Sequence, residues 1–196
     1  ILWHPETHYD MVRAGIGMYG LSPDPSVKSA RQLGIEAAMT LSAPLTSVKV
    51  IEEGTPASYG GTWQAPTRRW IGLVPLGYGD GILRACSNGA PVVVETERGL
   101  FPTQIIGRVC MDQFMIDLGP AEGEAGTPTS ASGRPPARVG ERALLFGDPE
   151  KGCPSADKWA IRAGTINYEI VTGLGAHIPR AYRDDTAHTQ EKNTHE

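Results

Sequence analysis

Short apolar runs separated by glycine-rich turns recur along most of the chain. The longest extends over residues 37–53, where β-branched residues mix with small polar ones before Gly54. Shorter runs with a composition typical of strands follow at 70–76, 91–96, 103–109, 114–118 and 142–146. The turns between them read Gly-Tyr-Gly-Asp-Gly, Ser-Asn-Gly-Ala, Glu-Arg-Gly and Gly-Asp-Pro. Regular short strands with such punctuation predict a mainly β fold, a barrel or a sandwich.

Four segments depart from this pattern. Residues 10–21 predict a short apolar strand that runs into glycines and ends at Ser-Pro-Asp-Pro, which continues neither a strand nor a helix. Residues 155–162 predict a helix with Ser155 as its N-cap, ending before Gly164. Residues 120–138 offer almost nothing to a core and predict a long exposed loop, and the polar residues 184–196 predict a flexible tail.

Composition and charge narrow the class of protein. A chain of 196 residues is long enough for one core plus an appended segment. Its net charge of −4 gives no basic surface for nucleic acid or an anionic membrane. No apolar run is long enough to span a bilayer, no signal peptide is evident, and the three cysteines form no CxxC pair, so we expect a cytoplasmic protein with small-molecule or protein partners. The chain begins at Ile1 instead of Met, so we expect a processed or cut piece.

Two motif matches lack the sequence context that their function requires. Gly15, Gly17 and Gly20 satisfy GxGxxG, but Pro23 and Pro25 deny the helix that a dinucleotide site needs. The Ser-Ala-Asp-Lys sequence at 155–158 matches SxxK without the partner motifs of a serine acylation site. The sequence holds no HExxH, Walker lysine loop or GxSxG, and its histidines have no ligand spacing, so metal catalysis and serine hydrolysis lack support.

Five glycine-containing segments follow one another in a fixed order. They are Arg-Ala-Gly-Ile-Gly-Met-Tyr-Gly-Leu (13–21), Ser-Tyr-Gly-Gly-Thr-Trp (58–63), Pro-Leu-Gly-Tyr-Gly-Asp-Gly-Ile-Leu-Arg (75–84), Gly-Arg-Val-Cys-Met-Asp-Gln (107–113) and Gly-Thr-Ile-Asn-Tyr-Glu-Ile (164–170). Each alone is ordinary turn chemistry, and a single tyrosine beside glycine is more often a packing residue than a catalyst. In this order, over residues 10 to about 183, they resemble the C-terminal part of the alanine racemases.

The resemblance implies a fold and a cofactor. That family, which uses pyridoxal 5'-phosphate (PLP) to interconvert L- and D-alanine for peptidoglycan synthesis, joins an N-terminal (β/α)8 barrel to a C-terminal β domain. We therefore expect residues 1–36 to be a remnant of the last strand and helix of the barrel, 37–183 the β domain and 184–196 the tail. The family's Schiff-base lysine lies early in the barrel and is absent here, and the lysines present lie in polar, surface-like stretches, so we expect the isolated chain to be inactive.

The resemblance also assigns the substrate-facing residues. Tyr59 matches the base that takes the α-proton of L-alanine, opposite the lysine, and it reaches across a head-to-tail homodimer. The backbone N–H of Met111 joins it to bind the substrate carboxylate. An ordinary tyrosine, with a pKa of about 10, is ionised about one part in a thousand at pH 7, so such a base needs cationic or hydrogen-bonding neighbours. Cys110, beside Met111, is expected to be a small buried residue.

On the cofactor side, Arg13 matches the arginine that faces the pyridine nitrogen of PLP. Guanidinium only donates hydrogen bonds, so the ring nitrogen stays unprotonated and is a weaker electron sink, which favours simple proton return. Gly15 and Ile16 follow the eighth barrel strand and match backbone phosphate ligands, to which Tyr168 adds a hydroxyl.

The remaining matched residues line the narrow entrance to the family's pocket, which keeps substrates small: Tyr78, Arg84, Arg108 and Ile166. Their other interpretation is interface packing. Two further functions stay open for the whole chain, a non-catalytic β domain for protein association and a broader-specificity amino-acid racemase. Without the barrel, the apolar face that would meet it predicts self-association of the isolated chain.

Overall fold

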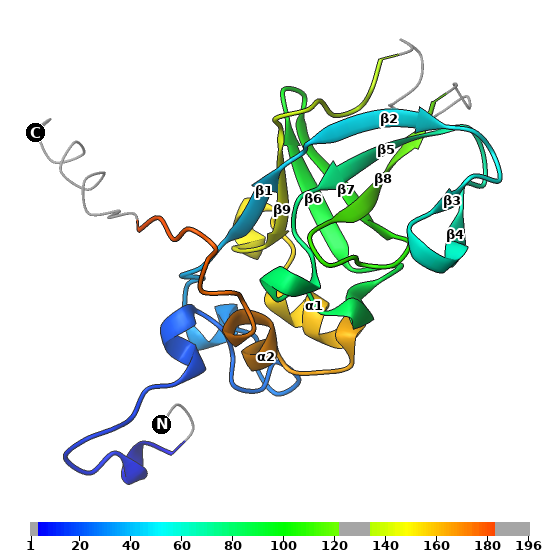
Figure 1. Cartoon of the computed structure of the whole chain (residues 1–196). Helices are drawn as coiled ribbons and strands as arrows, with labels where there is room; N and C mark the ends of the chain where they lie inside the picture. Colours follow the sequence, from blue (N-terminus) through cyan, green and yellow to red (C-terminus); the bar gives the residue numbers. More distant parts are fainter. Residues whose placement is uncertain (1–3, 122–133, 183–196) are drawn as a thin grey trace, which may run out of the picture.

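The structure is a computed structural model that describes residues 4–121 and 134–182. Its main element is a seven-stranded sheet in the order β1-β9-β6-β7-β8-β5-β2, in which every pairing is antiparallel. The strands are β1 (Leu41–Pro44), β2 (Ser47–Ile51), β5 (Arg69–Val74), β6 (Pro91–Thr96), β7 (Gly99–Ile106), β8 (Phe114–Pro120) and β9 (Arg142–Phe146). A separate hairpin of β3 (Pro56–Ala57) and β4 (Trp63–Gln64) lies beside it (Figure 1).

The sheet curls because two chain segments each serve two neighbours. Residues 41–51 pair first with β9 and then with β5, and between them Leu45 N–H donates to Glu141 O at 2.8 Å and Thr46 N–H to Leu73 O at 3.0 Å. β7 pairs with β6 through residues 99–104 and with β8 through residues 105–106. The two ends of the strand order thus meet in one run of chain, and the prediction of a mainly β, barrel-like domain is confirmed.

Most predicted strands are found within a few residues of their expected bounds, with three exceptions. The single strand expected at 37–53 is two strands, β1 and β2, because the chain changes its partner from β9 to β5 between Leu45 and Thr46. The run at 103–109 is shifted because Glu97 and Arg98 form a two-residue hairpin that starts β7 at Gly99, and Gly107, at φ +68°, ends it. The strand expected within 10–21 is wrong, since a 3-10 turn, η2 (Ile16–Tyr19), stands there instead. No strand within residues 4–121 and 134–182 pairs with that segment, and a lone strand leaves its backbone groups unpaired.

Helices are few and short. The predicted helix is α1 (Ala156–Ala163), in which Ser155 Oγ accepts from Lys158 N and Gly164 ends the last turn at φ +70°. A second helix, α2 (Asn167–Thr172), was not predicted because a six-residue segment shows too little periodicity. The 3-10 turns besides η2 are η1 (Pro5–Thr7), η3 (Arg31–Leu33), η4 (Tyr59–Gly61), η5 (Tyr78–Asp80), η6 (Arg84–Cys86) and η7 (Pro149–Lys151).

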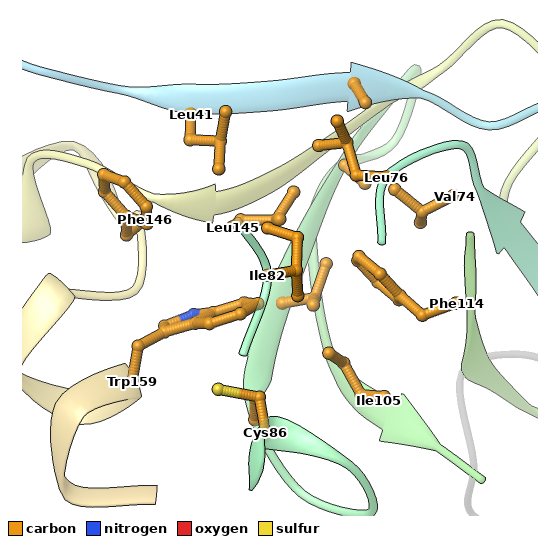
Figure 2. Close-up of a cluster of buried hydrophobic side chains, with 14 of the residues drawn as sticks. Leu41, Val74, Leu76, Ile82, Cys86, Ile105, Phe114, Leu145, Phe146 and Trp159 are labelled. Carbon is orange, nitrogen blue, oxygen red and sulfur yellow. The ribbon is translucent and has the colours of Figure 1, made fainter. Parts of the chain in front are cut away.

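One hydrophobic core fills the curled sheet. Figure 2 shows Trp159 of α1 lying among side chains of the sheet and its loops, including Ile82, Leu145 and Cys86. The indole Nε1 of Trp159 donates to Pro91 O at 2.9 Å, so the one polar atom of this large buried ring has a partner. A smaller cluster of Ala57, Ile71 and Ile106 lies under the β3–β4 hairpin.

The segments flanking the β domain pack differently from one another. Residues 6–15 are largely exposed and extend away from the sheet (Figure 1), whereas Ile16 and Leu21 are buried in the main core. The predicted exposed loop is wrong at its ends, because Ala121, Pro136 and Ala137 are buried, small enough to fit beside the strands they adjoin. Its centre, 122–133, and the tail predicted at 184–196 lie outside the described residues.

The Cys86 thiol provides a test of the core. Its burial raises its pKa to about 11, from 9.0 for a free thiol. Because the folded pKa lies above the unfolded one, the buried thiol contributes stability that is complete below pH 9 and is lost as pH rises toward 11. We expect iodoacetamide at pH 8 to leave Cys86 unmodified in the native chain and to alkylate it once urea unfolds the chain. Peptide mass mapping measures this, and rapid native alkylation of Cys86 would contradict the described burial.

Candidate functional site

Tyr59 lies at the tip of the turn that joins β3 to β4. Its side chain is 74% exposed, and its hydroxyl has no hydrogen-bond partner among the residues that the structure describes. The turn is tight at Gly60, where φ is +74° and where a Cβ would lie 2.8 Å from an Nη atom of Arg108. The guanidinium of Arg108 therefore rests against the backbone next to Tyr59, so a positive charge lies at the base of this turn.

The Tyr59 turn is joined to the 107–113 loop, which carries Arg108 and Met111. Ser58 Oγ donates to Arg108 O at 2.6 Å and lies 3.2 Å from Cys110 Sγ. Cys110 is half-buried, which corrects the expectation of a buried residue: its sulfur faces a polar hydroxyl, and the fully buried cysteine is Cys86. All three cysteines are free thiols.

The 107–113 loop is joined in turn to the loop that carries Tyr78. The N–H of Tyr78 donates to Cys110 O at 2.9 Å, and that of Gly79 to Met111 O at 2.8 Å. A Cβ on Gly77 would lie 2.2 Å from Met111 O, so only glycine permits this approach of the two backbones. Tyr59, Tyr78, Arg108 and Met111 consequently belong to one hydrogen-bonded group of loops, which we call the loop cluster (residues 58–61, 77–81 and 107–113).

Hydrogen bonds of Asp80 stabilise the Tyr78 loop. One carboxylate oxygen accepts from Gly77 N at 2.7 Å, and the other lies 2.7 Å from His177 Nε2. The carbonyl of Asp80 also accepts from Gly175 N at 2.9 Å. These contacts tie the chain after α2 to the loop cluster and fix the base of the turn on which Tyr78, half-exposed, projects.

Arg84 stands at the edge of the loop cluster. It begins η6, and its carbonyl accepts from Ser87 Oγ, which itself accepts from Val109 N at 3.0 Å. The structure thereby brings four predicted substrate-side and entrance residues, and the turn of Arg84, to one rim of the curled sheet.

The predicted cofactor-side residues form a second group, around η2 and α2. Arg13 and Gly15 are exposed just before η2, while the Ile16 side chain is buried and leaves only its backbone for a ligand. Ile166 and Tyr168 are exposed at the start of α2. Asn167 of α2 joins the two segments, because its Nδ2 donates to Ser22 O, just after η2, at 2.9 Å. The same nitrogen donates to Asp157 Oδ1 of α1 at 2.7 Å.

This second group suits one end of an anionic cofactor. The backbone N–H groups of Gly15 and Ile16 have no acceptor within the described ranges 4–121 and 134–182, and a Cβ on Gly15 would meet open space. Free backbone N–H groups are donors of the kind that binds a phosphate, and Asn167, next to Tyr168, ties α2 to Ser22 just beyond η2. Lys28, Lys49, Lys151 and Lys158 are exposed, and Lys192 lies outside the described residues.

The sequence did not single out four residues that organise the site: Ser58, Asp80, Asn167 and His177. Asp80 carried a signal, since a carboxylate flanked by glycines in a turn, here Gly79 and Gly81, commonly accepts backbone N–H bonds. Ser58 and Asn167 act through contacts 50 and 145 residues away, and His177 meets Asp80 across 97 residues, so no local pattern reveals them.

The curled β domain thus presents Tyr59, Tyr78, Arg108 and Met111 on one rim. The family model for the alanine racemase C-terminal domain matches residues 38–182, and the chain belongs to this family. The alanine racemase of Streptomyces coelicolor is 43% identical over 178 residues, covering 91% of this chain and 41% of that protein. That of Mycobacterium avium is 41% identical over 187 residues, covering 95% and 43%.

Solved structures agree with the sequence comparison. The alanine racemase from Streptomyces lavendulae matches with a TM-score of 0.80 at 40% identity, over 95% of this chain and 44% of that one. The Streptomyces coelicolor structure matches with a TM-score of 0.78 over 91% and 42%. The chain thus spans about two fifths of the length of the relatives it matches. No helix in the described part of the chain is long and apolar enough to cross a membrane.

Proposed function

We propose that this chain supplies the C-terminal part of an alanine racemase, which interconverts L- and D-alanine in the cytoplasm as a precursor supply for peptidoglycan. The observation that carries the proposal is the presentation of Tyr59. Its exposed phenol has no partner within the described residues, yet its turn is fixed to the rest of the loop cluster through Ser58 and Arg108. A held side chain with a free reactive end suits a base that meets a substrate supplied from outside the chain.

In this function Tyr59 takes or returns the proton on the L-alanine face of the substrate's Cα, in the pocket of the partner subunit of a head-to-tail dimer. Met111 binds the substrate carboxylate there through its backbone N–H. In support, that N–H has no acceptor within the parts of the chain that are described, and the residue is 55% exposed. Tyr78, Arg84, Arg108 and Ile166 narrow the entrance to the pocket, which limits the substrate to a small amino acid.

On the cofactor side, Gly15, Ile16 and Tyr168 would hold the phosphate of PLP, and Arg13 would donate to its pyridine nitrogen. When bound, PLP makes the α-hydrogen of an attached amino acid acidic enough to be removed. Arg13 keeps that nitrogen unprotonated, which favours return of the proton over side reactions. Asn167 supports this end of the site, because it joins α2 to the segment that follows η2.

The test is complementation. A fusion enzyme, in which the barrel half of the Streptomyces coelicolor racemase is joined to this chain, is expected to racemise alanine with added PLP, whereas this chain alone and the barrel alone are not. Chiral chromatography of the alanine measures the reaction. Racemisation by the chain alone would overturn the need for a lysine outside it, and a folded, PLP-binding fusion enzyme without activity would overturn the proposed function.

A second candidate function, a non-catalytic domain for protein association, is favoured by the exposed apolar side chains. Large hydrophobic residues exposed over more than half their surface include Tyr9, Met11, Met18, Met111 and Ile166. Side chains of this kind mark a contact with another protein or domain where they gather into one patch. A racemase half also needs this surface, to meet its barrel and its partner subunit, so the complementation result decides between the two functions.

A further inference from the structure

The backbone that precedes Tyr59 has a conformation that serine rarely adopts. Ser58 has φ +63° and ψ −175°, a region that is essentially restricted to glycine because Cβ clashes with the backbone. It is one of only three non-glycine residues with positive φ among those the structure describes, the others being Tyr9 and Asn88. A non-glycine residue keeps such a conformation only where its surroundings hold it there.

The surroundings of Ser58 show what holds it. Its hydroxyl donates to Arg108 O at 2.6 Å, a short contact, and lies 3.2 Å from Cys110 Sγ. On the same side, Gly107 has φ +68°, and a Cβ there would lie 2.5 Å from Ala57 O and 2.9 Å from Ser58 Cβ. The 107–113 loop therefore abuts the backbone of residues 57–58 directly, and the hydroxyl of Ser58 fastens the two together.

A glycine at position 58 would adopt the same backbone angles without strain but would have no hydroxyl. Serine at this position carries the backbone strain and supplies the hydrogen bond. The hydrogen bond therefore explains why a serine, and not a glycine, stands at position 58. The next residue in the chain is Tyr59. Ser58 donates its hydrogen bond to the carbonyl of Arg108, whose guanidinium lies against Gly60. The one hydroxyl thus fixes the direction in which Tyr59 leaves the turn and its position relative to Arg108.

We propose that Ser58 is a positioning residue for Tyr59: its hydrogen bond to Arg108 O holds a strained backbone that aims the phenol at the substrate. This inference rests on the proposed function. Loss of the hydroxyl lets the turn relax while the rest of the fold stays in place, so proton transfer on the L-alanine face slows. Proton transfer on the D-alanine face, which belongs to the lysine of the barrel, continues.

The experiment uses the fusion enzyme with Ser58→Ala and Ser58→Gly. Two rates are measured in deuterium oxide: racemisation by chiral chromatography, and exchange of the α-hydrogen of D-alanine for deuterium without inversion by NMR. We expect racemisation to fall about 10- to 100-fold, as for a misplacement near 1 Å, and exchange to stay within about twofold, reflecting lysine-face chemistry. Ser58→Gly relieves the strain, so its thermal midpoint is expected to be no lower than that of Ser58→Ala.

Ser47→Ala serves as the matched control. Ser47 is also half-buried, and it begins β2 opposite Leu73 of β5. Its hydroxyl has no hydrogen-bond partner in the described part of the chain, so both rates should be unchanged. Racemisation by both Ser58 variants at the Ser47→Ala rate would overturn the proposal, as would a parallel fall of racemisation and exchange, which indicates a general structural role. A fusion enzyme that fails to racemise before any substitution instead refutes the proposed function.

Discussion

Replacing Tyr59 by phenylalanine in the fusion enzyme is expected to lower the racemisation rate about 1,000-fold, within the range that a general acid or base contributes. The substitution removes one oxygen atom that makes no hydrogen bond within the described residues, and the side chain is 74% exposed, so the fold has little to lose. The expected defect is confined to one face of the substrate. Exchange of the α-hydrogen of D-alanine, measured by NMR in deuterium oxide, should continue at close to the rate of the unsubstituted enzyme.

Tyr182→Phe is the matched control, because Tyr182 is 91% exposed and lies outside the loop cluster. It should leave both rates unchanged. Comparable racemisation by Tyr59→Phe and Tyr182→Phe would remove Tyr59 from the reaction. Loss of racemisation and exchange together would mean that the phenol serves binding or assembly on both faces, and not proton transfer on one of them.

The two Tyr59 and Ser58 experiments together separate chemistry from positioning. Tyr59→Phe removes the reacting atom, whereas the Ser58 variants leave it in place and release its support. If the effects act through the same phenol, the double variant should racemise no more slowly than Tyr59→Phe alone, since effects on one interaction are not additive. This comparison places the hydrogen bond from Ser58 to Arg108 O within the function of Tyr59.

The β strands were predictable from sequence because each depends on local composition and on the turn that ends it. Pro91–Thr96 and Arg142–Phe146 are found at the predicted bounds, since proline, glycine and the hairpin at Glu97 and Arg98 limit where pairing starts and stops. The helix after Ser155 was predictable for the same reason, through its cap and Gly164. The closure of the sheet was not, because it depends on residues 41–51 pairing with strands about 25 and 100 residues further along.

In the candidate site, too, some residues can be predicted from local sequence and others depend on long-range contacts. Tyr59, Tyr78 and Met111 stand in motifs that can be read locally, and the structure joins their loops through backbone bonds such as that from Tyr78 N to Cys110 O. The supports of these loops are distant pairs, and His177 on Asp80 is one of them. A local pattern thus identifies residues that meet a ligand, whereas long-range hydrogen bonds identify those that hold them.

Trp159→Ala is expected to lower the free energy of unfolding of the chain by about 3–5 kcal/mol, the usual cost of truncating a buried aromatic residue. Trp159 is 2% exposed and fills the space between α1 and the sheet (Figure 2). Its removal leaves a cavity and also deprives Pro91 O of the indole N–H at 2.9 Å. Because domains of this size are stable by about 5–15 kcal/mol, the loss is a large share of the total. Urea unfolding followed by far-UV circular dichroism measures it.

Ile161→Ala on the same helix is the control, because Ile161 is 79% exposed and its truncation should change the unfolding free energy by less than about 0.5 kcal/mol. Equal losses for the two variants would contradict the described orientation of α1. The comparison also bears on the site, since Asp157 of α1 accepts from Asn167, which precedes Tyr168. Loosening α1 by Trp159→Ala should therefore weaken PLP binding by the fusion enzyme at urea concentrations well below global unfolding, whereas Ile161→Ala should not. Absorbance titration with PLP measures the binding.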